Sequence, residues 1–344
     1  DDEGNPKYKP ENIIKATLIG THSDKEGTKT NTFKRTLETV PEINSDCYTL
    51  EGERLTEFMR AISQISIYAK NPLTIGNYTL DAKAEAWLDG NKFFQRHAVI
   101  VGSTGSGKSW TVARLLEQIA PLPSCNAVVF DIHGEYAPLK ERGFQHFKIA
   151  GPNDKVSESV IFLPYWLLTY NEMISLMLDR SDNNAPNQAM AFSNAVIEQK
   201  RKELETLNKP DVLASFTIDS PVPYKISDIL TDFKSKDAEM VPGARAEKQG
   251  PLNGKLTRFI QRLESKTQDK RLNFLFNCSN EVLNYDYVEI ICKKLMHANS
   301  LQKDKGVKII DFSEVPSDVL PLMVSLVGRL IFSIQQWIPK ENRH

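Results

Sequence analysis

An apolar run that leads directly into a glycine-rich loop constrains this chain more than any other feature. Residues 98–101 predict a buried strand, and residues 102–109 complete the pattern G-x-x-x-x-G-K-[ST]. Residues 110–119 predict a helix immediately after the loop. Strand, loop and helix in this order predict a phosphate-binding loop, because glycines let backbone N–H groups surround phosphates and a helix N-terminus attracts anions.

Lys108 and Ser109 carry the expected chemistry of this loop. The Lys108 ammonium is expected to reach the β- and γ-phosphates of ATP, and the Ser109 hydroxyl is expected to ligate Mg²⁺. The alternative is a glycine-rich turn that fits the pattern by chance. The expected nucleotide contacts are Gly102, Ser103, Thr104, Gly105, Ser106, Gly107, Lys108, Ser109 and Trp110.

Composition narrows the class of protein. The 344 residues are 40% hydrophobic and 25% charged, which is typical of a soluble globular protein with two or three domains. The net charge of -1 gives no overall attraction to nucleic acid, so DNA binding would depend on local patches. Four scattered cysteines and an N-terminus without an apolar segment predict a cytoplasmic chain. Pro321 and Arg329 interrupt the longest apolar stretch, which predicts a core helix and no membrane contact.

The order of predicted elements indicates an α/β fold with four segments. Residues 1–92 predict a small N-terminal β-barrel, with a helical pattern at 54–65 and short strand-like runs at 16–19, 47–50, 65–69, 73–75 and 78–80. Residues 93–152 predict the first part of an ATPase core, with a buried strand that ends in polar groups within 126–136 and a short strand at 147–149. Residues 153–305 predict a helical insertion, including helices at 170–178, 189–207 and 256–263. Residues 306–344 predict a return to the core, incomplete at the C-terminus, with a strand and then a helix at 317–337.

Two motifs together resemble the HerA branch of the HerA/FtsK ATPases. Residues 96–109 read R-H-A-V-I-V-G-S-T-G-S-G-K-S, and residues 130–136 read F-D-I-H-G-E-Y. The resemblance implies a RecA-like P-loop core in a hexameric ring that uses ATP and Mg²⁺ as a translocase or helicase on double-stranded DNA. It also implies a nuclease or other effector partner, which in bacterial antiphage defence can be a sirtuin-like protein.

The resemblance suggests roles for three further residues, all expected to be catalytic. Asp131 and Glu135 lie on the family's second-strand motif, near enough to nucleotide to orient water or metal-bound solvent. The alternative is a strand-end turn capped by carboxylates. Arg96 aligns with an arginine that the family places near the neighbouring subunit's ATP, where it would act as an arginine finger. The alternative is a surface arginine at the start of a strand.

One departure from the family concerns hydrolysis. The family's next element is an apolar strand that ends in an acidic pair, and the given chain ends at His344 without it. Asp311 also ends a predicted strand, but Phe312 and Ser313 follow where the acidic partner is expected. Because such a pair holds the water shell of the magnesium ion and activates the attacking water, the chain as given is expected to bind ATP better than it hydrolyses it.

A basic segment is the candidate DNA contact. Residues 243–271 contain eight positive side chains, Arg245, Lys248, Lys255, Arg258, Arg262, Lys266, Lys270 and Arg271, against three negative ones. The spacing of Leu256, Phe259, Ile260 and Leu263 predicts a helix that buries these four residues. It leaves a basic ridge largely outside the buried face, made of Lys255, Arg258, Arg262 and Lys266. Such a ridge could follow phosphates without reading bases, and the alternative is an ordinary solvated helix face.

Three hypotheses about function follow. The first is a ring-forming ATPase that translocates DNA. The second is an oligomeric scaffold that uses nucleotide to organise and activate an effector enzyme. The third is another P-loop ATPase, such as a conjugative coupling or DNA-packaging motor.

Overall fold

The computed structural model describes residues 15–23, 32–37, 40–62, 73–79, 81–88, 90–122, 125–140, 143–243, 246–296, 306–337 and 339. The chain forms two compact units, Asp1–Ile119 and Ala120–His344, and each is described by itself. The division falls inside the segment 93–152 that the sequence assigns to the first part of an ATPase core. The four predicted domain segments stay predictions.

The first unit contains short strands and helices. They are β1 (Thr21–Ser23), β2 (Thr32–Lys34), α1 (Gly52–Ile62), β3 (Leu73–Tyr78), β4 (Asp81–Leu88), α2 (Gly90–Gln95) and α3 (Lys108–Ile119). The strands make two separate antiparallel pairs, β1 with β2 and β3 with β4, so the predicted N-terminal β-barrel stays a prediction. The strands predicted at 16–19 and 47–50 are absent, because these described residues are largely exposed and have no ladder partner. The predicted strand at 65–69 lies outside the described residues.

The second unit is built on a four-stranded parallel sheet, which gives the α/β class expected from the sequence. Its strands are β5 (Asn126–Asp131), β10 (Gly306–Asp311), β6 (Phe144–Ile149) and β7 (Val160–Ile161), in the order β5-β10-β6-β7. The first five residues of β10 are buried, as expected for a strand with a neighbour on each side in a parallel sheet. The register pairs Gly306 with Asn126 and Asp311 with Asp131, so the carboxyl ends of β5 and β10 coincide.

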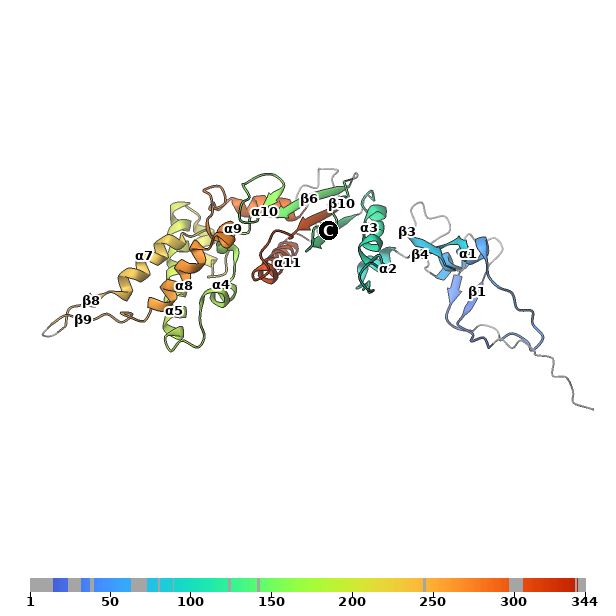
Figure 1. Ribbon diagram of the computed structural model, residues 1–344, viewed down its shortest axis with the longest axis horizontal. Coiled ribbons are helices and arrows are strands. Elements are labelled where there is room, and N and C mark those ends of the chain that lie inside the picture. The colour runs from blue at the N-terminus through green and yellow to red at the C-terminus, as the bar shows by residue number, and fades with distance from the viewer. Residues whose placement is uncertain are drawn as a thin grey trace, which may run out of the picture. The chain divides into compact units, whose positions relative to one another are not determined.

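A helical segment separates β7 from β10. Its elements are η1 (Tyr165–Leu167), α4 (Tyr170–Met177), α5 (Ala185–Thr206), α6 (Pro210–Ser215), α7 (Ile226–Asp237), α8 (Thr257–Gln268), η2 (Lys270–Leu272), α9 (Asn273–Phe276) and α10 (Tyr287–Leu295). A short hairpin, β8 (Met240–Val241) with β9 (Lys248–Gln249), projects from these helices (Figure 1). After β10 the chain forms α11 (Leu320–Trp337).

One apolar core joins the sheet to the helices of the second unit. Phe259, Ile260 and Leu263 of α8 are buried, which confirms the predicted apolar face. They belong to one cluster with Met173 and Met177 of α4, Met323 and Leu326 of α11, and Ile310 of β10. No helix within the described residues is long and apolar enough to cross a membrane.

A buried lysine stands in the middle of the sheet. Lys308 on β10 is only 1% exposed, and its Nζ donates to the carbonyl oxygen of Lys294 at 2.9 Å and to that of Lys293 at 3.5 Å. These carbonyls end α10, where the helix dipole favours a cation. Burial nevertheless lowers the pKa of Lys308 to about 8.

The lowered pKa predicts how stability responds to pH. Between about pH 8 and pH 10 the folded protein has released the Lys308 proton while an unfolded lysine still holds it. Raising the pH through this window should therefore increase the free energy of unfolding of the wild type relative to Lys308→Met, in urea titrations at each pH. Lys202→Met, at an exposed lysine, is the control. An equal response in both variants would contradict the prediction.

Candidate nucleotide site

The loop from Gly102 to Gly107 adopts a conformation that requires its glycines. Gly105 and Gly107 have φ values of +80° and +89°, in the left-handed region that other residues rarely adopt. A Cβ atom added to Gly102 would meet the Ser106 hydroxyl, so a larger residue there would require the Ser106 side chain to rotate. The Ser106 N–H donates to the Ser103 carbonyl oxygen at 3.2 Å and closes the turn.

The helix that follows the loop is present, and it starts two residues before the predicted start at residue 110. α3 begins at Lys108, and the Thr111 N–H and hydroxyl donate to the Gly107 carbonyl oxygen at 2.9 Å and 3.0 Å. The N–H groups of the first turn, which includes Ser109, face out of the helix end. The Lys108 Nζ donates to the Ser103 carbonyl oxygen at 2.9 Å, so its ammonium lies across the loop.

Two hydrogen bonds join α3 to β3 within the first unit. The Gln118 side chain donates to the Thr74 carbonyl oxygen at 2.6 Å and accepts from the Thr74 N–H at 2.7 Å. Through them β3 positions the helix that carries Lys108, a contact that sequence reasoning missed. Trp110 is 82% exposed at the start of α3, free of the packing that holds Leu115 and Leu116.

The strand predicted before the loop is wrong. Residues 97–103 have no strand structure, and Val99 and Val101 are each 83% exposed. A strand needs a partner for its N–H and C=O groups, and no ladder among the described residues includes 97–103. Arg96, which follows α2, is also exposed. Its finger role requires a second subunit and stays a prediction.

The end of β5 is a turn organised by one buried carboxylate. Asp131 is 3% exposed, and its two oxygens accept from the N–H groups of Glu135 at 3.0 Å and Tyr136 at 2.9 Å. Gly134 permits the turn with a φ of +71°. The exposed Glu135 side chain is carried by this turn. The geometry matches the strand-end turn that the sequence leaves open, and a catalytic role for either carboxylate stays a prediction.

The end of β10 supports this turn from the neighbouring strand. The Phe312 N–H donates to the Asp131 carbonyl oxygen at 2.9 Å, and the Phe312 ring stacks on Phe130 with centroids 5.6 Å apart. The Asp311 carboxylate accepts from the Ser313 N–H at 2.7 Å. A Cβ atom on Gly134 would lie 3.3 Å from the Ser313 Oγ. Phe312 and Ser313 therefore stabilise the turn. In the sequence, only their position directly after Asp311 could have indicated this role.

Lys108 and Ser109 belong to the first compact unit, and Asp131 and Glu135 belong to the second. The structure thus gives the local geometry of a phosphate-binding loop and of a strand-end turn, each within its own unit. The loop fits a nucleotide with Mg²⁺, because its glycine conformations, the Lys108 ammonium and the Ser109 hydroxyl supply what phosphates and the metal require.

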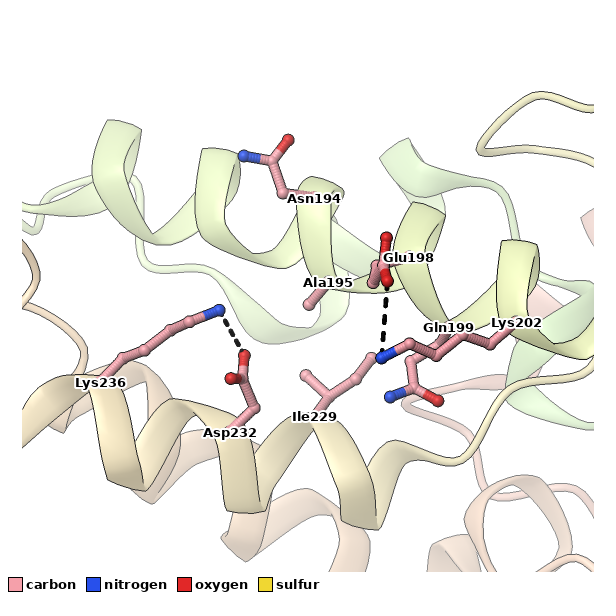
Figure 2. Close-up of a pocket in the computed structure, with 8 residues that line it drawn as sticks. All are labelled: Asn194, Ala195, Glu198, Gln199, Lys202, Ile229, Asp232 and Lys236. Atoms are coloured by element: carbon pink, nitrogen blue, oxygen red, sulfur yellow. Dashed lines mark hydrogen bonds and ion pairs between the residues drawn. The ribbon is translucent and has the colours of Figure 1, made fainter.

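A groove of about 360 Å³ lies between α5 and α7 and contains none of the predicted site residues (Figure 2). Lys236 pairs with Asp232 at 2.6 Å on α7, and Lys202 pairs with Glu198 at 3.5 Å on α5. Its four charged side chains are paired along their own helices, so the groove has no excess of either charge.

Comparisons with known proteins agree with the loop motifs. Residues 73–331 match the family model described as the central domain of helicase HerA. A protein described as a probable helicase from Methanocaldococcus jannaschii is 41% identical over 73 residues, which cover 21% of this chain and 14% of that protein. The DNA double-strand break repair helicase HerA of Pyrococcus furiosus is 34% identical over 74 residues, covering 22% and 13%. The chain thus matches well under two thirds of either relative's length.

Among solved structures, the unbound bacterial conjugative coupling protein TrwB is similar at a TM-score of 0.40 and 14% identity. The similarity covers 86% of this chain and 60% of that one.

The buried carboxylate yields a stability prediction. Asp131→Asn replaces one acceptor oxygen with an NH₂ group, which cannot accept from the Glu135 or Tyr136 N–H. Leaving a buried donor unpaired should lower the free energy of unfolding by about 1–3 kcal/mol in chemical denaturation. Asp318→Asn, at an exposed carboxylate, should change it little. Equal effects of the two variants would refute the assigned role.

Proposed function

Because this chain belongs to the HerA helicase family, we propose that it contains the ATP-binding core of a motor that moves along double-stranded DNA. The observation that carries the proposal is the loop at 102–109. Its glycine conformations and the helix N-terminus that follows suit the phosphates of a nucleoside triphosphate. We further propose that this core has the RecA-like arrangement.

Residues of the chain have separate roles in this proposal. Lys108 binds the β- and γ-phosphates, and binding requires its ammonium to leave the Ser103 carbonyl oxygen. Ser109 ligates Mg²⁺, which when bound neutralises negative charge on the phosphates. Asp131 fixes the turn through its two backbone hydrogen bonds, and the exposed Glu135 orients water for attack.

The candidate DNA contact is the basic ridge on α8. Its charges are less available than the sequence indicates, because Arg262 forms an ion pair with Asp179 and Lys255 donates to the Pro251 carbonyl oxygen at 2.7 Å. Arg258 is exposed and faces away from the buried residues of α8. Arg245 lies outside the described residues. We assign phosphate contact first to Arg258 and, once its ion pair opens, to Arg262.

We propose the assembly from the family to which the chain belongs. A hexameric ring in the cytoplasm would let Arg96 of one subunit act on the ATP of the next and would enclose the DNA. A nuclease or sirtuin-like effector would act on the DNA or on the cell once the ring is loaded, in antiphage defence.

The loop assignment has a direct test. Lys108→Ala should abolish ATP turnover and weaken ATP binding at least about tenfold, because an ammonium on the phosphates is lost. Arg114→Ala on the same helix, at an exposed cation paired with Glu117, is the matched control and should bind ATP normally. Calorimetry and phosphate release measure both variants. Normal turnover in Lys108→Ala would exclude the assigned site.

The ridge is tested through its salt dependence. Arg258→Gln should weaken binding of duplex DNA and lower the slope of log affinity against log salt by about one, as loss of one phosphate contact requires. Lys202→Gln removes the same charge from α5 and should leave the slope unchanged. Fluorescence anisotropy over a salt series distinguishes the two. An unchanged slope in Arg258→Gln would remove this residue from the DNA contact.

A further inference from the structure

We propose that α4 couples the ATPase core to the basic ridge on α8, and that the Arg329–Glu172 ion pair is the positioning contact for this coupling. The inference rests on the proposed function and adds to it a route by which DNA binding affects the turn that carries Glu135. Its basis is that an ion pair holds each end of α4, one to α11 of the core and the other to α8.

The first contact lies at the N-terminus of α4. Arg329 of α11 donates from Nε to Glu172 Oε1 at 3.2 Å and from Nη2 to Glu172 Oε2 at 3.0 Å. Its Nη2 also donates to the Leu167 carbonyl oxygen at 2.8 Å. A guanidinium that binds a carboxylate through two parallel bonds fixes orientation as well as distance. Arg329 therefore holds η1 and the start of α4 to α11.

The start of α4 does not need the contact with Arg329 in order to form. Thr169 and Glu172 make a complete capping box, in which the Glu172 N–H donates to the Thr169 hydroxyl at 3.3 Å and the Thr169 N–H donates to Glu172 Oε2 at 2.7 Å. The capping box satisfies the helix end without any help from α11. What Arg329 adds is a connection between two helices, which is the property that a coupling contact requires.

The second contact lies just beyond the C-terminus of α4. Asp179 accepts from Arg262 of α8 and is itself held by the Ser181 N–H at 2.9 Å and the Ser181 hydroxyl at 2.6 Å. In this proposal the Arg262 guanidinium binds either the Asp179 carboxylate or a DNA phosphate. Binding of DNA through Arg262 would release Asp179 and with it the end of α4, so the pair supplies a contact with two states.

The path from α4 to the turn at the end of β5 lies within the second unit and is continuous. The apolar residues of α4 pack in one core with those of α8 and α11. α11 follows the segment whose Phe312 N–H is bonded to Asp131 and whose Ser313 lies against Gly134. Because packed cores shift as units, a displacement of α4 would be passed through Arg329 and α11 to the turn that carries Glu135.

The test compares ATP turnover of the full-length protein with and without duplex DNA. Glu172→Gln keeps one oxygen for the Thr169 N–H but loses the charged pair, and Arg329→Lys keeps the charge but loses the two-bond geometry. Both variants should retain basal turnover and DNA affinity while stimulation by DNA falls at least about fivefold. Glu198→Gln breaks the α5 ion pair seen in Figure 2 and should keep full stimulation.

Each outcome either supports or overturns the proposed coupling. Loss of stimulation in the two α4 variants, with Glu198→Gln unaffected and thermal unfolding midpoints near that of the wild type, supports the coupling. If Arg329→Lys does not fold, Glu172→Gln decides, because its capping box is retained. Stimulation equal to wild type in Glu172→Gln overturns the inference alone. A wild type that DNA does not stimulate overturns the proposed motor together with the inference.

Discussion

The position of β10 between β5 and β6 is the constraint on which the second unit depends. Its partners precede the helical insertion in sequence, so the sheet forms only when the chain returns after α10. β10 is so buried that its Lys308 side chain requires hydrogen-bond acceptors, and carbonyl groups at the end of α10 supply them. The same pairing aligns Asp311 with Asp131 and so supports the turn that carries Glu135.

Features that depend on neighbouring residues were predictable from sequence. A helix directly after the loop is confirmed, although α3 begins at Lys108 and not at the predicted residue 110. The positive φ values of Gly105 and Gly107 agree with the glycine-rich loop, which follows from local backbone preferences. The buried face of α8 follows from helical periodicity in the same way. The strand at 98–101 is wrong because apolar composition indicates a preference for burial, whereas a strand also requires a partner that the local sequence does not specify.

Contacts between distant residues could not be predicted. Sequence reasoning counted Arg262 as an available phosphate ligand, but Asp179 neutralises it across 83 positions of sequence. Glu172 and Arg329 are 157 positions apart, and nothing in the motifs indicates that they meet. Such pairs arise from the packing of α4, α8 and α11 into one core.

The proposed function is a motor, so the most direct measurement is movement along DNA. A third strand bound in the major groove of a duplex is displaced by a protein that moves along that duplex. With Mg²⁺ and ATP, the full-length protein should displace the third strand, and a non-hydrolysable ATP analogue should not support displacement. ATP hydrolysis in the presence of the duplex without any displacement would contradict the account.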